Sequence, residues 1–388
     1  MEPGAAVRRR TAAPESLAGG EPTLTHAKTR IQLAAYLACA VVLLACLGAG
    51  AGCSGGSEHS TVRVLFAGSL IIPFDQLERE FEAAYPHIDV DMEGHGSIQA
   101  VRLVSDLHEQ ADLVVTADYS LIPMLLYESR DPDTGLPYAD WYAVFATNEM
   151  VIAYTEQSAF ADEVEEDNWF DIITRPDVRV GNSDPRLDAN GYRALMMTKL
   201  AEAFYGVPTL FSDVYGGKFR VPLRVVDREG VAVVRVPEVL ETKSGSSLVL
   251  RPYSVQLLPL LESGNIDYAF EYASVAKQHG MRYVALPPEI NLSDPAAAAE
   301  YAQVMVHLDF QRFASVTPQF LGEPIRYGVT IPSNARDPEA AATLLAFLLG
   351  PEGQRIMAEN HQPMVVPAPA DGLERLPEAV RPFCVPAD

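Results

Sequence analysis

The sequence predicts an α/β protein of two lobes, each built on a mainly parallel sheet flanked by helices. The chain has 388 residues, more than one ordinary domain, and 48% of them are apolar, which is enough to form substantial cores. From Thr61 onward, short β-branched runs alternate with segments whose apolar residues recur at helical spacing. This alternation is typical of sheets whose parallel strands are connected by helices.

The first strand and helix are the clearest part of this pattern. Residues 62–66 alternate as a strand does, and apolar residues recur at helical spacing over residues 74–81 until Pro86 ends the helix. Further strands are expected at residues 88–92 and 113–115, and helical patterns separate them. The order of strand, helix and strand therefore begins the first lobe.

The remaining pattern divides the chain between two lobes. We expect residues 61–145 to form the first part of lobe I, residues 146–275 to form lobe II, and residues 276–388 to return to lobe I and add C-terminal helices. The apolar stretch 141–154 is interpreted as a strand that crosses between the lobes. Residues 296–306 have a helical pattern.

Residues 1–53 are interpreted as a signal peptide that ends in a lipid-attachment cysteine. Basic residues precede an apolar run at residues 31–47, and small residues lead to Cys53, as is typical of a secretion signal. Cys46 is an alternative attachment site, and an uncleaved membrane span is a second alternative. Residues 54–60 are expected to form a flexible tether. We therefore expect an extracytoplasmic protein that a lipid anchors to the cell membrane.

The formal net charge of −23 excludes two classes of partner. A surface this acidic repels nucleic acid and does not bind anionic membrane surfaces electrostatically. A small buried anion is still compatible with this charge, because it responds to dipoles within a few ångströms. Charges farther away than about 8–10 Å are screened by salt.

Three polar residues stand where an expected strand gives way to an expected helix. Ser69 follows Gly68, Ser97 follows Gly96, and Asp188 precedes a helical segment. Helix N-termini present unpaired backbone N–H groups and the positive end of the macrodipole, so they are natural anion sites. The alternative is that each of the three side chains only caps its helix.

Several short motifs occur along the chain and together resemble a known family. They are Ala67-Gly68-Ser69-Leu70 with Pro73-Phe74, Gly94-His95-Gly96-Ser97, Ala117-Asp118-Tyr119-Ser120-Leu121-Ile122-Pro123, Phe145-Ala146-Thr147-Asn148-Glu149-Met150, Gly191-Tyr192-Arg193 and Asp267-Tyr268-Ala269-Phe270-Glu271-Tyr272. In this order they closely resemble the binding proteins of archaeal-type tungstate/molybdate ABC importers, from about Val62 to Pro363. The resemblance implies a type II periplasmic-binding-protein fold with a ligand cleft between the lobes.

The resemblance also implies a ligand site to which both lobes contribute. Ser69 and Ser97 would donate hydrogen bonds to the oxyanion oxygens from lobe I. Asp188 and Glu271 would coordinate tungsten or molybdenum from lobe II, because a hard, high-valent metal accepts further oxygen ligands whereas the sulfur of sulfate does not. The implied ligand-binding set is Gly68, Ser69, Gly96, Ser97, Asp188 and Glu271.

A binding protein of this family is a transport protein and not an enzyme. The resemblance implies that tungstate or molybdate is the cargo, that no cofactor is needed, and that ABC permease and ATPase subunits are the partners of a monomeric chain. The preference between the two oxyanions is left open. Residues 231–239 are additional to the usual pattern of the family.

Three other functions are alternatives to this reading. A phosphate- or sulfate-type binding protein would need no metal coordination, and a sensory protein would share the fold. An extracytoplasmic hydrolase would use Asp188 and Glu271 as acid and base, although no nucleophile or zinc motif supports it. Nearby, Asp118 is expected either to face the cleft or to cap a turn, whereas Tyr192 and Tyr272 are expected to pack.

Overall fold

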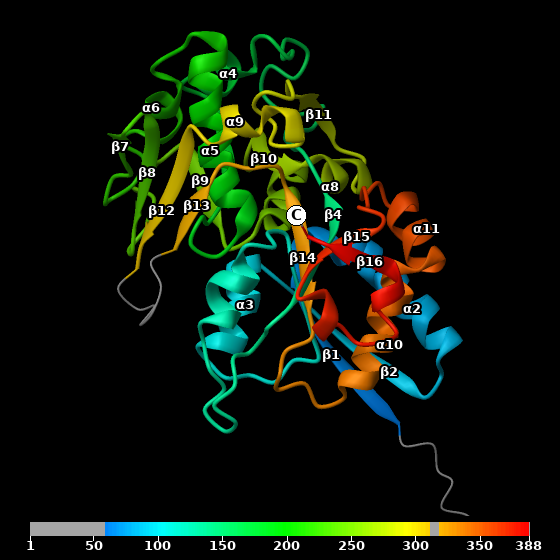
Figure 1. Ribbon diagram of the computed structural model, residues 1–388. Coiled ribbons are helices and arrows are strands. Elements are labelled where there is room, and N and C mark those ends of the chain that lie inside the picture. The colour runs from blue at the N-terminus through cyan, green and yellow to red at the C-terminus, as the bar shows by residue number, and fades with distance from the viewer. Residues whose placement is uncertain (1–58, 311–317, 388) are drawn as a thin grey trace, which may run out of the picture. The chain divides into compact units, whose positions relative to one another are not determined.

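The computed structural model describes residues 59–310 and 318–387, and three mixed sheets with their helices make up this part of the chain (Figure 1). The expected signal peptide, with Cys46 and Cys53, lies outside the described residues. Within the described ranges, no helix has the length and apolar character needed to cross a membrane. The α/β architecture expected from the sequence is confirmed.

The first sheet has seven strands and lies between two groups of helices. Its strand order is β16 (Cys384–Pro386), β15 (Ala368–Asp371), β4 (Tyr142–Thr147), β14 (Arg326–Thr330), β3 (Leu113–Thr116), β1 (Ser60–Ala67) and β2 (Ile88–His95). Figure 1 shows α3 (Ser97–Ser105) on one side, and α2 (Ile71–Ala84) and α10 (Pro338–Leu349) on the other. Val62, Val64 and Leu65 are fully buried because helices cover both faces of β1.

The second and third sheets are formed largely by the middle of the chain. The second has the order β11 (Arg282–Ala285), β5 (Met150–Tyr154), β10 (Tyr268–Tyr272), β6 (Val180–Ser183) and β9 (Leu248–Arg251). The third has the order β13 (Gln319–Leu321), β12 (Val304–Asp309), β8 (Val231–Pro237) and β7 (Arg224–Arg228). The additional residues 231–239 therefore supply a strand, and the alternating valines of β8 pair in parallel with β12.

Helix α5 (Ala189–Tyr205) joins the second and third sheets into one packed body. We call this the second body, and we call the first sheet with its helices the first body. The helix contacts β6 and β10 of the second sheet and β8 and β12 of the third. Most of its residues are consequently buried, and its apolar residues are not confined to one stripe. The helix ends at Gly206, whose φ of 68° is the left-handed conformation that glycine adopts most easily.

The remaining helices are short. They are α4 (Trp169–Ile173), α6 (Leu210–Tyr215), α7 (Leu258–Glu262), α8 (Ala273–Gln278), α9 (Ala298–Tyr301) and α11 (Pro351–Glu359), with the 3₁₀ turns η1 (Gly68–Leu70) and η3 (Ser254–Leu257). Asp337 caps α10 by accepting a hydrogen bond from Ala340 N at 2.9 Å. The expected long helix at 296–306 is wrong, because α9 ends at Tyr301 and the β-branched residues that follow pair as β12.

The chain passes from the first sheet to the second at Asn148 and Glu149, between β4 and β5. The stretch 141–154 thus forms two strands where one crossing strand was expected. The chain joins the first sheet again with β14. Because β14 runs antiparallel to both β3 and β4, the sheets are mixed and not mainly parallel.

The return to the first sheet occurs later than the expected division after residue 275. β11 pairs antiparallel with β5 of the second sheet, and β12 pairs with β8 of the third. Sequence periodicity identifies a strand but does not say which neighbour that strand pairs with. Sheet membership is decided by contacts between residues that are far apart in the sequence.

Candidate functional site

Asp188 lies at the start of α5, but its side chain does not cap that helix. Its backbone is extended at the N-cap position, and no capping hydrogen bond of normal geometry is formed. Instead, Oδ2 of Asp188 accepts a hydrogen bond from the backbone N–H of Ser254 at 3.0 Å. The side chain is 6% exposed, so this carboxylate is held at the N-terminus of α5 by a residue of the same body.

Glu271 on β10 is the second carboxylate of the site and is fully buried. Its Oε1 accepts hydrogen bonds from Oγ of Ser254 and from the backbone N–H of Tyr272, both at 2.8 Å. Within the described part of the chain, its Oε2 has no hydrogen-bond partner. Ser254 therefore bridges the two carboxylates, and one buried carboxylate oxygen retains its full capacity to accept a ligand.

Burial dominates the electrostatics of both carboxylates. It raises the pKa of Asp188 from 3.8 to about 6, although hydrogen bonds from Ser183 and Ser254 and the charge of Arg193 act in the opposite direction. It raises the pKa of Glu271 from 4.5 to about 8, and the charge of Asp188 adds to this increase. Asp188 ionises first, so its negative charge opposes the ionisation of Glu271.

Ser97 and Gly96 bring the first sheet into contact with Asp188. Oγ of Ser97 accepts a hydrogen bond from the backbone N–H of Ala117 at 2.9 Å. A Cβ at Gly96 would lie 2.4 Å from the carbonyl oxygen of Leu187 and 3.2 Å from Cβ of Asp188. Only glycine permits this approach.

Ser69 lies in η1 on the same side of the site and is connected to the crossing segment. Its Oγ is 2.9 Å from the hydroxyl oxygen of Tyr327. That hydroxyl also accepts a hydrogen bond from Nδ2 of Asn148 at 3.1 Å. Gly68 brings η1 close to the ring of Tyr253, 3.1 Å from the position of a Cβ. Ser69 is thus fixed next to the residue that precedes Ser254.

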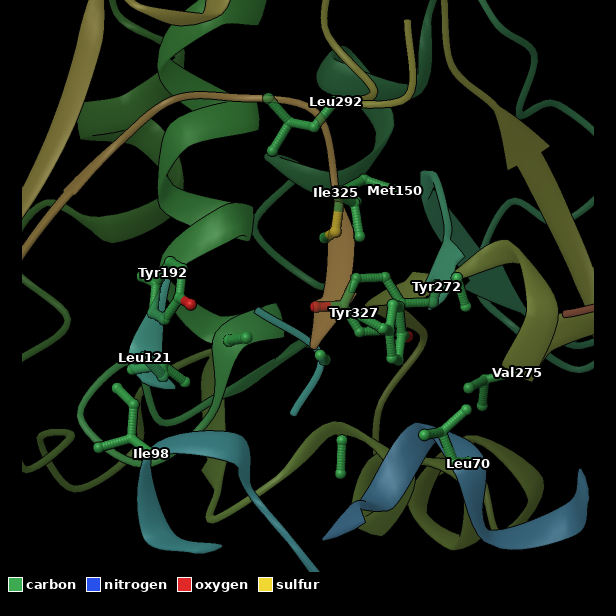
Figure 2. Close-up of a cluster of buried hydrophobic side chains, with 14 of the residues drawn as sticks. Leu70, Ile98, Leu121, Met150, Tyr192, Tyr272, Val275, Leu292, Ile325 and Tyr327 are labelled. Carbon is green, nitrogen blue, oxygen red and sulfur yellow. The ribbon is translucent and has the colours of Figure 1, made fainter. Parts of the chain in front are cut away.

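Asp188 and Glu271 are buried, and Figure 2 shows a cluster of buried apolar side chains from both bodies. Leu70 and Ile98 come from elements of the first sheet, whereas Met150 and Tyr272 come from the second. All four are buried. Water is therefore excluded around the carboxylates, which strengthens their interaction with any charged ligand.

Of the six sequence-predicted site residues, Asp188 and Glu271 are linked through Ser254, Gly96 lies beside Asp188, and Gly68 lies beside Tyr253. Ser69 and Ser97 are hydrogen-bonded to Tyr327 and Ala117, partners that the motifs did not indicate. Ser69 and Ser97 lie on the first body, and Asp188 and Glu271 lie on the second. The two bodies are in contact through Gly96 and Gly68. Ser254 was missed, and its only signal is that it begins a turn after β9. Asp118 both caps a turn, by accepting from Ser120 N at 3.0 Å, and faces the second body.

The described residues contain no group of three or more His, Cys, Asp or Glu arranged to hold a metal ion. His95 lies 3.5 Å from Glu93 and belongs to no such group. The site accordingly combines two carboxylates with hydroxyl and amide donors. A set of this kind suits an oxygen-rich ligand better than a resident metal ion of the protein.

Two bodies joined by crossing strands, with polar groups from both at their contact, define a solute-binding protein. The family model for bacterial extracellular solute-binding proteins matches residues 62–361. The chain belongs to this family.

Relatives support this assignment over most of the chain. The chain is 39% identical over 363 residues to the molybdate/tungstate-binding protein WtpA of Thermococcus kodakarensis, which covers 91% of this chain and 96% of the relative. It is 38% identical to the WtpA of Pyrococcus abyssi, with coverage of 89% and 96%. Because the family and these relatives are binding proteins, the expectation that the chain is not an enzyme is confirmed.

Solved structures show the same fold at low sequence identity. The sulfate-binding protein SubI from Mycobacterium tuberculosis H37Rv aligns with a TM-score of 0.50 at 14% identity, covering 85% of this chain and 93% of SubI. The substrate binding protein of an ABC transporter from Agrobacterium tumefaciens aligns with a TM-score of 0.51 at 15% identity, covering 80% and 81%. These similarities establish the fold alone.

We predict that Gly96→Ala separates α3 from the loop before α5. The new methyl group would meet the backbone of Leu187, so the hydrogen bond from Gln99 N to Leu187 O at 3.2 Å should break. Amide hydrogen exchange should therefore be faster at Gln99. Gly94→Ala is the matched control, because its Cβ would meet side chains and no backbone, those of Ile71 at 3.2 Å and Phe66 at 3.4 Å. Equal protection of Gln99 in both variants would contradict this account of Gly96.

We also predict that the ligand-free protein loses stability as the pH rises toward 8. The folded state holds the proton of Glu271 more tightly than the unfolded state, since burial raises its pKa from 4.5 to about 8. Stability from this group is fully present below the unfolded pKa and is lost as the pH passes through the folded pKa. Urea unfolding between pH 5 and 9 measures the slope of the free energy of unfolding against pH. Glu271→Gln should flatten it, and an unchanged slope would refute the assignment.

Proposed function

We propose that the chain captures tungstate or molybdate by coordinating the metal centre of the oxyanion with Asp188 and Glu271. The observation that carries this proposal is the buried Oε2 of Glu271, which has no hydrogen-bond partner in the described part of the chain. A buried acceptor of this kind is costly unless a ligand satisfies it. The names of the WtpA relatives agree with this choice of ligand.

Metal coordination explains why carboxylates face an anion. A dianion near two buried carboxylates would meet strong repulsion at low dielectric. Tungsten and molybdenum in their oxyanions are hard, high-valent centres that accept additional oxygen ligands, and carboxylate oxygen suits such centres. Asp188 and Glu271 would then bind the metal directly, which sulfur or phosphorus does not allow.

The first body would hold the oxygens of the ligand. Ser97 already accepts a hydrogen bond from Ala117, so its hydroxyl proton can be donated to an oxyanion oxygen. Ser69 can donate in the same way if Tyr327 donates to it. Gly68 and Gly96 place these serines beside the second body, and the N-terminal amides of α3 add a favourable dipole.

The same proposal implies a role for the protein in transport. As an extracytoplasmic member of an ABC importer, it would deliver the oxyanion to permease and ATPase subunits. A lipid on Cys53, with Cys46 as the alternative, would hold it at the membrane, and the polar residues that follow would act as a tether. No second ligand is supported by a specific observation in the site.

The central prediction concerns Asp188→Asn combined with Glu271→Gln. The double change preserves size but replaces two carboxylates with amides, which are poorer ligands for a hard metal. Affinity for tungstate, measured by calorimetry, should fall by about a hundredfold or more. Sulfate should become a better competitor, because two negative charges have been removed from the site.

The matched control is Glu166→Gln with Asp167→Asn, which removes the same charge from an exposed segment. It should leave tungstate affinity unchanged. Retained or improved tungstate affinity in the Asp188→Asn, Glu271→Gln variant would show that the site is a plain anion cleft without metal coordination.

A further inference from the structure

Two neighbouring residues near the start of α5 reach from the second body to the first. The hydroxyl group of Tyr192 donates a hydrogen bond to Oδ2 of Asp118. Nη1 of Arg193 donates to the carbonyl oxygen of Ala117 at 2.6 Å, and Nη2 lies 3.4 Å from Oδ2 of Asp118. Ala117 and Asp118 follow β3 of the first sheet, so each of these contacts joins the two bodies.

These contacts are buried and held in place from both sides. Tyr192, Arg193 and Asp118 are 1%, 3% and 4% exposed. On the second body, Tyr192 stacks on Phe320 with ring centroids 4.1 Å apart, and Arg193 donates to the hydroxyl group of Tyr272 at 2.8 Å. These contacts within the second body therefore direct the polar ends of Tyr192 and Arg193 toward the loop after β3, without help from a ligand.

Asp118 has no oxygen left for a ligand. Its Oδ1 accepts hydrogen bonds from the backbone N–H and the hydroxyl group of Ser120, at 3.0 and 2.8 Å. Its Oδ2 is occupied by Tyr192 and faces Arg193. The cluster therefore acts between the bodies and not on the bound molecule.

The cluster can exist only while the bodies are in contact. The bodies are connected by crossing segments such as Asn148 and Glu149, an arrangement that permits hinge motion. If the bodies separate, the ion pair of Asp118 and Arg193 breaks and both side chains become hydrated. If they close with one partner missing, the other is buried without its counterpart, which is strongly unfavourable.

We propose that Asp118, Tyr192 and Arg193 form a closing latch that sets how firmly the two bodies hold together, and thereby how slowly a bound ligand leaves. The effect on ligand release rests on the proposed function, whereas the equilibrium between open and closed bodies does not. Since the latch does not touch the ligand, it changes the residence time of every ligand by the same factor.

The test uses Tyr192→Phe, which removes only the hydroxyl group and preserves the stack on Phe320. Tyr205→Phe is the matched control, because Tyr205 is on the same helix and donates to the carbonyl oxygen of Glu166 within the second body, at 2.9 Å. Stopped-flow measurements with sodium tungstate and sodium molybdate give the rates. Spin labels at the exposed positions Leu107 and Val239, in a chain whose cysteines are replaced by serine, report the separation of the bodies with and without tungstate.

In Tyr192→Phe, the dissociation rate should rise by about tenfold to a hundredfold, as expected for losing a hydrogen bond to a charged group. The factor should be the same for both oxyanions, the association rate should be unchanged, and the closed fraction should fall. Unchanged dissociation and label distances, or a factor that differs between the oxyanions, would overturn the latch.

A second variant and a second readout keep the test decisive. Asp118→Asn should act in the same direction if Tyr192→Phe does not fold. If the parent protein binds neither oxyanion, the proposed function fails, and the label distances of the ligand-free parent and variants still decide the latch. Equal distances would then overturn it, and a wider separation in Tyr192→Phe would support it.

Discussion

The burial of Asp188 and Glu271 on either side of Ser254 is the constraint on which the rest of the site depends. Burial raises the pKa of both carboxylates, and the charge of Asp188 adds to the increase at Glu271. Ser254 satisfies one oxygen of each, and the second oxygen of Glu271 is left without a hydrogen bond among the described residues. A binding protein can maintain such a pair because its ligand supplies the missing interaction.

Contact between the bodies follows from the same constraint. The carboxylates stay dry only when the first sheet covers them, and the absence of a side chain at Gly96 allows α3 to approach Leu187. Opening the bodies would hydrate the carboxylates and release the ligand, so affinity and closure are linked. The contacts of Asp118 with α5 lie at this boundary.

The sequence predicted much of the fold because its signals are local. Alternating apolar residues marked β1, and Pro86 marked the end of α2. Periodicity could not assign β11 to the second sheet, because pairing depends on residues far apart in the chain. The first residues of β12 were expected to be helical, so this strand was missed. For that reason the sheets are more mixed, and the return to the first sheet is later, than we expected.

The candidate site was predictable to a different degree for each residue. Ser69, Ser97 and Asp188 stand at junctions between strands and helices, and such junctions carry a local signal. Glu271 lies within a buried strand and was indicated only by the family resemblance. Ser254 is 66 positions from Asp188 in the sequence, and no short motif encodes a contact over such a distance.

X-ray absorption at the tungsten edge tests directly whether Asp188 and Glu271 coordinate the metal. Free tungstate is tetrahedral, and coordination by Asp188 and Glu271 would add oxygen neighbours at longer distance to the tungsten centre. The coordination number should be above that of free tungstate in the loaded protein, and it should return to the tetrahedral value for any tungstate bound by the Asp188→Asn, Glu271→Gln variant. A spectrum of the loaded parent protein identical to that of free tungstate would contradict metal coordination.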